Sequence, residues 1–395
     1  MEIESGVRNC RGLFKGCESF NQPVRIPNTV TNCGRMFEYC RRFNQSVTIS
    51  NSAETCYLMF SRCYDFNQPI DIPDSVEDCE SMFANCRSFN QPVKIPSSAK
   101  NCKAMFSRCK NFDQSVVMPD SVEDCASMFF HNISLNKPIK ISRFAINCNS
   151  LFHSCWNFNQ PVIIPPNVRL CSSMFYNCKT FNQPLFIPDS VKDCSNMLED
   201  CILFNQPINL SRNTIDCEGM FKRCVEFNQP ISLPQTVRNC KQMFYKCKTF
   251  NQPVNIPDGV KDCESMFAFA INLNQPIILS KSSEITKGMF KGCVAFNQQV
   301  IIPDNVKDCS YMFYKCRTFN QPVAMPEIVE DCRCMFENCD KLNSPVSLPK
   351  YFTKGKDMFK GCVEFKQSLG DYDSPEYKDL LLGESYKEET NHFGG

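Results

Sequence analysis

The sequence of 395 residues contains three histidines and one tryptophan, and it has neither a glycine-rich phosphate loop nor a nucleophile motif. His131, His153 and His392 have no recurring acidic partner, and no cysteine partner apart from the cysteines that recur along the whole chain. Catalysis by general acid and base, or by a bound metal, needs such partners at defined spacings. These absences argue against an enzyme and against a metal or any other cofactor.

An excess of one charge is also missing, because 43 Lys and Arg residues stand against 42 Asp and Glu residues. Domains that bind nucleic acid are usually strongly basic, so the overall charge predicts no nucleic-acid partner. The opening MEIESGVRNC contains no apolar stretch. We therefore expect neither secretion by a classical signal nor insertion into a membrane.

What the sequence does contain is a 23-residue repeat that runs without one insertion or deletion. Every step of 23 residues from Phe20 to Phe365 falls on Phe or Leu, which gives 16 anchors. With the anchor as position 1, the unit reads FNQPVxIPxxVxDCxxMFxxCxx. A register that tolerates substitution but no change of length indicates stacked coils of fixed circumference. We expect one elongated repeat domain over residues 1–369, followed by a tail over residues 370–395.

Apolar residues fall at positions 1, 5, 7, 11, 17 and 18 of the unit, and cysteines fall at positions 14 and 21. The alternation in PVxIP predicts a short strand with one buried face. Its flanking prolines remove backbone donors and keep the strand to about three residues. The later spacing of three to four between Val, Cys and Met-Phe predicts a short helical or 3-10 return.

Asparagine occupies position 2 in 14 of the 16 coils, as at Asn159 and Asn182. A column of Asn just before the strand predicts stacked side-chain amides that satisfy the backbone groups of the turn. The alternative is that the same column lines a polar binding stripe.

With these positions assigned, the unit resembles the leucine-rich repeats of BspA type, also called the Treponema pallidum type, whose pattern is close to CxxLxxIxIPxxVxxIxxxAFxxC. The FNQP element also resembles a related bacterial and viral surface-protein repeat. The resemblance extends from Ile3 to Leu369, and it departs from the family in having Phe for Leu at position 1 and Cys for Ile at position 14. One coil that fits position by position contains Cys316, Phe319, Val323, Met325, Pro326, Val329, Cys332, Met335, Phe336 and Cys339.

The resemblance implies an α/β repeat solenoid, a right-handed arc of about 16 coils with short parallel strands on its concave face and short helical or 3-10 returns. Members of the family bind proteins rather than catalyse reactions, and they occur on bacterial surfaces, in parasitic protists and in large DNA viruses. Likeness of fold is a weak argument for function.

Of the 29 cysteines, 14 lie at position 14 and 14 at position 21. Disulfides, metal sites and buried thiols are the three alternatives. An obligate bridge within a coil would lose both partners together, yet Cys125 is matched with Asn132 and Cys263 with Ala270. The spacing also differs from that of zinc clusters. We expect reduced thiols that pack as small hydrophobic residues in a reducing compartment, with later oxidation in a virion left open. Representatives of this structural ladder are Cys33, Cys40, Cys171, Cys178, Cys240 and Cys247.

Position 6, in the middle of the strand, varies from coil to coil and should point outward. Its apolar members predict small hydrophobic patches for a protein partner, against the alternative of incidental apolar surface. The candidate partner-binding residues are Val117, Ile163, Phe186, Ile278 and Ile301. Residues around position 21 are often basic. Two interpretations stay open: these cations stack with opposite charges between coils, or they form an anion-binding stripe.

The tail begins a new pattern at Ser374-Pro375-Glu376, which is a favourable helix start. A helix continuing through Leu382 would cover the last coil, and a partner-docking peptide is the alternative.

The leading hypothesis is a non-enzymatic interaction scaffold that binds another protein, or copies of itself, through the concave sheet or an edge. The first alternative is a structural component of a virus particle or cytoskeletal lattice, and the second is a surface adhesin. We expect the protein in the cytoplasm or in a virion assembled inside the cell.

Overall fold

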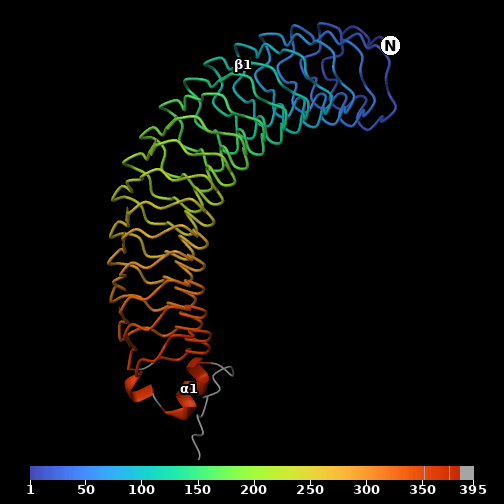
Figure 1. Ribbon diagram of the computed structural model, residues 1–395. Helices are drawn as coiled ribbons and strands as arrows, with labels where there is room; N and C mark the ends of the chain where they lie inside the picture. Colours follow the sequence, from blue (N-terminus) through green and yellow to red (C-terminus); the bar gives the residue numbers. More distant parts are fainter. Residues whose placement is uncertain (351, 373, 383–395) are drawn as a thin grey trace, which may run out of the picture. The chain divides into compact units, whose positions relative to one another are not determined.

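The computed structural model describes residues 1–350, 352–372 and 374–382. Its internal contacts divide the chain into two compact units, Met1–Thr214 and a second unit that begins at Ile215. Within each unit the coils stack in sequence order, and residues 23 apart lie beside one another (Figure 1). The repeat solenoid predicted from the sequence is confirmed.

Short parallel strands form on one side of the coils, which we call the strand face. They pair in successive coils with a register of 23 residues, for example Val116 with Ile139 and Val117 with Lys140. In every strand the first residue is buried and the second is exposed, as the alternation predicted. The strands are β1 (Val116–Val117), β2 (Ile139–Lys140), β3 (Leu185–Phe186), β4 (Ile208–Asn209), β5 (Val254–Asn255), β6 (Ile277–Ile278), β7 (Val323–Ala324) and β8 (Val346–Ser347).

Most hydrogen bonds between coils are made by the return segment, positions 13 to 21, rather than by the strands. Backbone N–H groups at positions 14, 16, 18 and 20 donate to carbonyls of the next coil, as Cys33 does to Thr55 at 3.0 Å and Phe37 to Met59 at 2.9 Å. The intervening N–H groups donate within their own coil, as Met36 does to Cys33 at 3.2 Å. Because prolines flank the strand, the return carries the regular ladder instead.

The return differs from the helical or 3-10 segment that we predicted, because it is a series of β turns. Positions 16 and 20 have positive φ in every coil, from 52° at Ala104 to 77° at Gly16. A positive φ at the third residue of a turn closed by an i to i+3 hydrogen bond is the type II arrangement, and no helix contains it. The Met-Phe spacing therefore reflects two successive turns.

Ala104 offers a clean test of this backbone conformation. Its φ is 52°, so Ala104→Gly should raise the free energy of unfolding by up to about 1 kcal/mol, because glycine has no Cβ to strain there. Ala126 lies one position before a left-handed residue of its coil. Ala126→Gly should therefore have the opposite effect and lower the free energy of unfolding by about 0.5–1 kcal/mol. Urea unfolding of both variants checks the reversal of sign, and a loss of stability at both positions would contradict it.

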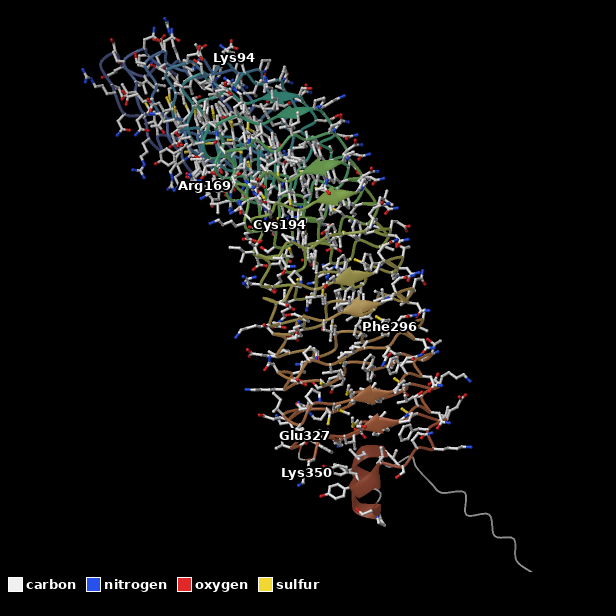
Figure 2. All side chains as sticks on the ribbon, turned by 90° about the vertical axis from the view of Figure 1, so that its left-hand side faces the viewer. Lys94, Arg169, Cys194, Phe296, Glu327 and Lys350 are labelled. Atoms are coloured by element: carbon white, nitrogen blue, oxygen red, sulfur yellow. The ribbon has the colours of Figure 1, made fainter. Side chains whose placement is uncertain are left out.

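The core of each unit is a stack of aromatic rings beside methionine and cysteine. Phe at positions 1 and 18 alternates along the stack. Ring centroids are 4.3 Å apart between position 18 of one coil and position 1 of the next (Phe37 and Phe43), and 5.5 Å apart between position 18 of successive coils (Phe37 and Phe60). Figure 2 shows sulfur atoms inside the coils, where Cys194 lies, whereas Lys94 and Arg169 project outward. No coil could bury this surface alone, so the stacking itself creates the core.

The helix α1 (Pro375–Leu382) lies against the last coil, after the short 3-10 helix η1 (Gly370–Tyr372) (Figure 1). The carbonyls of Leu380 and Leu381 accept the N–H groups of Asp357 at 3.0 Å and Phe359 at 2.8 Å. In earlier coils these N–H groups, at positions 16 and 18, bond to the next coil. The helix therefore takes the place of a further coil, and residues 383–395 of the expected tail lie outside the described residues.

Candidate functional site

The strand face carries the five residues that the sequence singled out. Each is strongly exposed although it follows a buried neighbour, because alternate residues of a strand point to opposite faces. Ile163 and Phe186 occupy successive coils of the first unit and are 86% and 71% exposed. At a strand spacing of roughly 4.8 Å, two such side chains form one apolar patch.

A second patch lies in the second unit, at Ile278 and Ile301. Two shallow hollows of about 400 Å³ each surround these residues, one lined by Ser232, Asn255 and Ile278 and the other by Ile301 and Ala324 among others. The hollows arise because short side chains occupy position 6 in the neighbouring coils. Isoleucine beside a shallow hollow is suited to receive an apolar side chain from a partner.

Val117 stands apart from both patches. Its partner in the register of β1 and β2 is Lys140, so its exposed side chain has a charged neighbour rather than an apolar one. We therefore place the candidate site at the two isoleucine-containing patches, with Val117 outside them.

The asparagine column has a structural role in the described coils. Asn159 Oδ1 accepts the backbone N–H of Asn182 at 2.9 Å and the side-chain amide of Gln183 at 3.1 Å. Asn182 makes the same two contacts with the following coil. Because each Oδ1 already accepts two hydrogen bonds from the next coil, the column offers no free acceptor oxygen there to a ligand.

The position-21 cysteines use their thiols as hydrogen-bond donors. Cys40, Cys178 and Cys247 donate to the position-18 carbonyls of the preceding coil, which belong to Phe14, Phe152 and Phe221, at 2.9–3.0 Å. Burial raises the pKa of Cys40 to about 12 and raises the pKa of Cys178 and Cys247 as well. The thiolate is the reactive form of cysteine, so these thiols should react slowly as nucleophiles.

The position-14 cysteines form a second buried column. Cys33, Cys171 and Cys240 are wholly buried, and burial raises the pKa of Cys171 and Cys240. Neighbours in this column approach each other closely, with 3.5 Å between the Sγ atoms of Cys125 and Cys148. All 29 cysteines are thiols in the structure.

Asn132 is a defect in the position-21 column. It is fully buried, and neither Nδ2 nor Oδ1 has a hydrogen-bond partner among the described residues. The equivalent defect at Ala270 buries no polar atom. A buried carboxamide without hydrogen-bond partners lowers the free energy of unfolding, so Asn132 is a local source of instability in this column.

The histidines within the described ranges lie among aromatic rings. His153 stacks on Phe130 at 4.6 Å and on Tyr176 at 4.4 Å, and burial lowers the pKa of His153 to about 4. His131 lies edge-on to Trp156, and burial lowers the pKa of His131. His392 is outside the described residues.

Cys332, Cys334 and Cys339 are the closest approach to a metal-binding cluster in the sequence. Within the part of the chain that the structure describes, no group of three or more His, Cys, Asp or Glu residues is placed to hold a metal ion. The helices in those same ranges are all too short or too polar to span a bilayer.

An additional apolar surface, which the position-6 column did not indicate, borders a groove of about 680 Å³ in the first unit. The groove runs along positions 9 to 12, where polar side chains usually bond the preceding coil, as Ser98 Oγ does to the Val76 carbonyl at 2.9 Å. Phe144 replaces that polar residue and is 53% exposed, beside Ile146. Alignment of position 10 across the coils could have revealed it.

Comparison with known families gives a match along most of the chain. Five overlapping stretches match the family model described as "Mycoplasma protein of unknown function, DUF285", at residues 8–118, 100–208, 169–276, 257–350 and 282–372. The comparison with curated proteins gave no match.

Among solved structures, the chain is similar to a leucine-rich repeat protein from Bacteroides ovatus, with 17% identity, 88% of each chain covered and a TM-score of 0.56. It also matches a leucine-rich cell surface protein from Faecalibacterium prausnitzii, with 15% identity, 98% of this chain and 86% of that chain covered and a TM-score of 0.39. A third match is the T. pallidum leucine-rich repeat protein, with 19% identity, 48% and 80% covered and a TM-score of 0.34. The Bacteroides structure supports the leucine-rich-repeat fold, and at this identity it supports the fold alone.

Proposed function

We propose a function for this chain, which belongs to the family described as Mycoplasma protein of unknown function, DUF285, with matching repeats over residues 8–372. It is a non-enzymatic scaffold that binds another protein, or a further copy of itself, through its strand face. The BspA-type resemblance of the repeat unit supports the same role. A cytoplasmic protein, or a component of a virion assembled inside the cell, fits the many buried thiols.

The observation that carries the proposal is the exposure of Ile163 and Phe186 in successive coils. Neither side chain packs in the core of the solenoid. The buried residues of these strands are the ones on either side of Ile163 and Phe186. Transfer of such a side chain from water to an interface is worth about 1.5–3 kcal/mol. Adjacent exposed aromatic and aliphatic side chains on a rigid face are suited to anchor a partner.

A structural role in a larger assembly is the alternative, and a surface adhesin is a second one. End-to-end stacking would need the last coil to be open, whereas α1 occupies the hydrogen-bonding groups there. This favours a binding scaffold, and a monodisperse monomer in light scattering would agree with it. Stacking into filaments, or copurification with a particle, would favour the structural role.

Site-specific photo-crosslinking tests the strand-face proposal. A photoreactive amino acid in place of Ile163 should crosslink a defined protein in an extract of the natural source, whereas the same group in place of Lys94, also at position 6, should not. Binding of that purified protein should then fall at least tenfold in Ile163→Ser/Phe186→Ser.

The control for this test is Lys94→Ser/Lys140→Ser, which changes two exposed residues of the same column in the same unit. It should bind like the unaltered protein. Identical crosslinks at residues 94 and 163, or equal loss of affinity in the two double variants, would contradict a site at this patch.

A further inference from the structure

One edge of the first unit is free of acidic residues over five successive coils. We call it the basic edge, and it consists of positions 19 to 23 in segments 84–88, 107–111, 130–134, 153–157 and 176–180. The four cations in it are Arg87, Arg108, Lys110 and Lys179. A chain with almost no net charge thus concentrates positive charge on one surface.

These cations are not paired with carboxylates. Among the described residues no ion pair involves any of the four. Three of them lie instead over aromatic rings, with 4.3 Å from Arg87 Cζ to the ring centroid of Tyr64 and 5.5 Å from Arg108 Cζ to that of Phe130. The third is Lys179, whose Nζ lies 4.3 Å from the ring centroid of Trp156.

The unpaired cations favour one of the two interpretations of the basic edge, an anion-binding stripe, over stacked opposite charges. Stacking of opposite charges between coils would require acidic residues in these segments, and they contain none. Cation–π contacts restrain the side chains while leaving their charge available to a ligand. Restrained cations lose less conformational freedom when an anion binds, so the edge is organised for an anionic partner.

Most aromatic rings on this edge already contact another ring or a cation, although Trp156 stays 36% exposed. Phe130, His153 and Tyr176 stack on one another in three successive coils, at 4.6 and 4.4 Å between ring centroids. The cations cover further ring faces at Tyr64 and Trp156. Binding of single-stranded nucleic acid depends on free aromatic faces on which bases stack, and this edge offers few.

The second unit repeats the pattern independently. Its segments 245–249, 268–272, 291–295 and 314–318 contain five cations and no acidic residue. Lys246 lies 5.2 Å from the ring of Tyr245, and Lys291 lies 5.0 Å from that of Tyr314. Only Arg317 in these segments has a carboxylate partner within the described residues, Asp340 at 3.9 Å. The recurrence argues against a chance distribution of charge.

We propose that the basic edge of the first unit binds an acidic polypeptide segment of a partner protein, which lies across successive coils with its Asp and Glu side chains at Arg87, Arg108, Lys110 and Lys179. The proposal rests on the proposed function as a protein-binding scaffold and assigns to it a second surface and a partner chemistry. Polypeptide is favoured over nucleic acid because most of the ring faces already contact another ring or a cation.

The test uses the full chain and fluorescence anisotropy at an ionic strength of about 0.15 M, where the Debye length is near 8 Å. The probe is a labelled 15-residue peptide of Glu and Ser, compared with a labelled oligouridylate of the same net charge. The edge variant is Arg87→Gln/Arg108→Gln/Lys110→Gln. The matched control, Arg25→Gln/Lys94→Gln/Lys140→Gln, removes the same charge from the strand face of the same unit.

We expect the unaltered protein to bind the peptide, and to bind it more tightly than the oligouridylate. The affinity for the peptide should fall at least tenfold in the edge variant and less than twofold in the control. Equal losses in the two variants would overturn the site, because only overall charge would then matter. Tighter binding of the oligouridylate, or no binding of the peptide, would overturn the partner chemistry. None of these outcomes affects the crosslink at residue 163, so the proposed function stands or falls separately.

Discussion

Replacing Phe181 by alanine should lower the free energy of unfolding by about 3–5 kcal/mol, because the cavity left in the ring stack cannot close. Phe181 has no exposed surface, and its ring lies 4.3 Å from Phe175 and about 6 Å from Phe158 and Phe204. Coils on both sides hold these neighbours in place, so little relaxation is available.

Phe186→Ala is the matched control for Phe181→Ala. It makes the same chemical change five residues later, at a side chain that is 71% exposed, and should alter stability by no more than about 0.5 kcal/mol. Urea denaturation followed by circular dichroism measures both. Similar destabilisation by the two substitutions would show that the ring stack is not the core of the unit.

Replacing Asn132 by cysteine should stabilise the protein, by about 1–3 kcal/mol, because the buried carboxamide has no hydrogen-bond partner. The new thiol would have the position of the other position-21 cysteines, such as Cys109, which donates to the Phe83 carbonyl at 3.0 Å. By the same register, the introduced thiol would reach the carbonyl of Phe106, so the substitution both removes unsatisfied atoms and adds a donor.

Two further substitutions separate these contributions. Asn132→Ala removes the carboxamide without adding a donor and should stabilise less than Asn132→Cys. Asn132→Asp places a charge in the same buried site and should be strongly destabilising. A destabilising effect of Asn132→Cys in the same denaturation experiment would show that the carboxamide is satisfied in solution.

The repeat register and the buried columns could be predicted from the sequence, because each depends only on which residues recur every 23 positions. Asn159 and Cys178 illustrate this, since a residue that recurs every 23 positions lies beside the neighbouring coil and can bond to it. Asn159 accepts the N–H of Asn182, and Cys178 donates to the Phe152 carbonyl. The strand face followed from the same alternation, and it places Ile163 and Phe186 outward.

The return segment was harder to predict, because the spacing of Met and Phe is the same in a helix and in successive turns. The missed signal lies at positions 16 and 20, where the chain has no Val, Ile or Thr and has Gly at Gly219 and Gly292 among others. β-Branched residues disfavour positive φ, so their absence from two columns marks left-handed residues.

The ring contacts of the basic edge were not predicted for a different reason. Lys179 and Trp156 are 23 residues apart, so their contact is visible only when neighbouring coils are aligned by position. The basic character of the edge was evident from composition, but its pairing with rings rather than carboxylates needed the structure.

The central claim is that the recurring columns build the solenoid and leave function to the variable surface, and thiol labelling tests it most directly. Native protein should be alkylated first at Cys17, which is exposed, and more slowly at the half-buried Cys334 and Cys362. The remaining 26 thiols should react only after denaturation, giving 29 without any reductant. Rapid native labelling of column thiols such as Cys171 and Cys178, or fewer than 29 thiols after denaturation, would contradict the account.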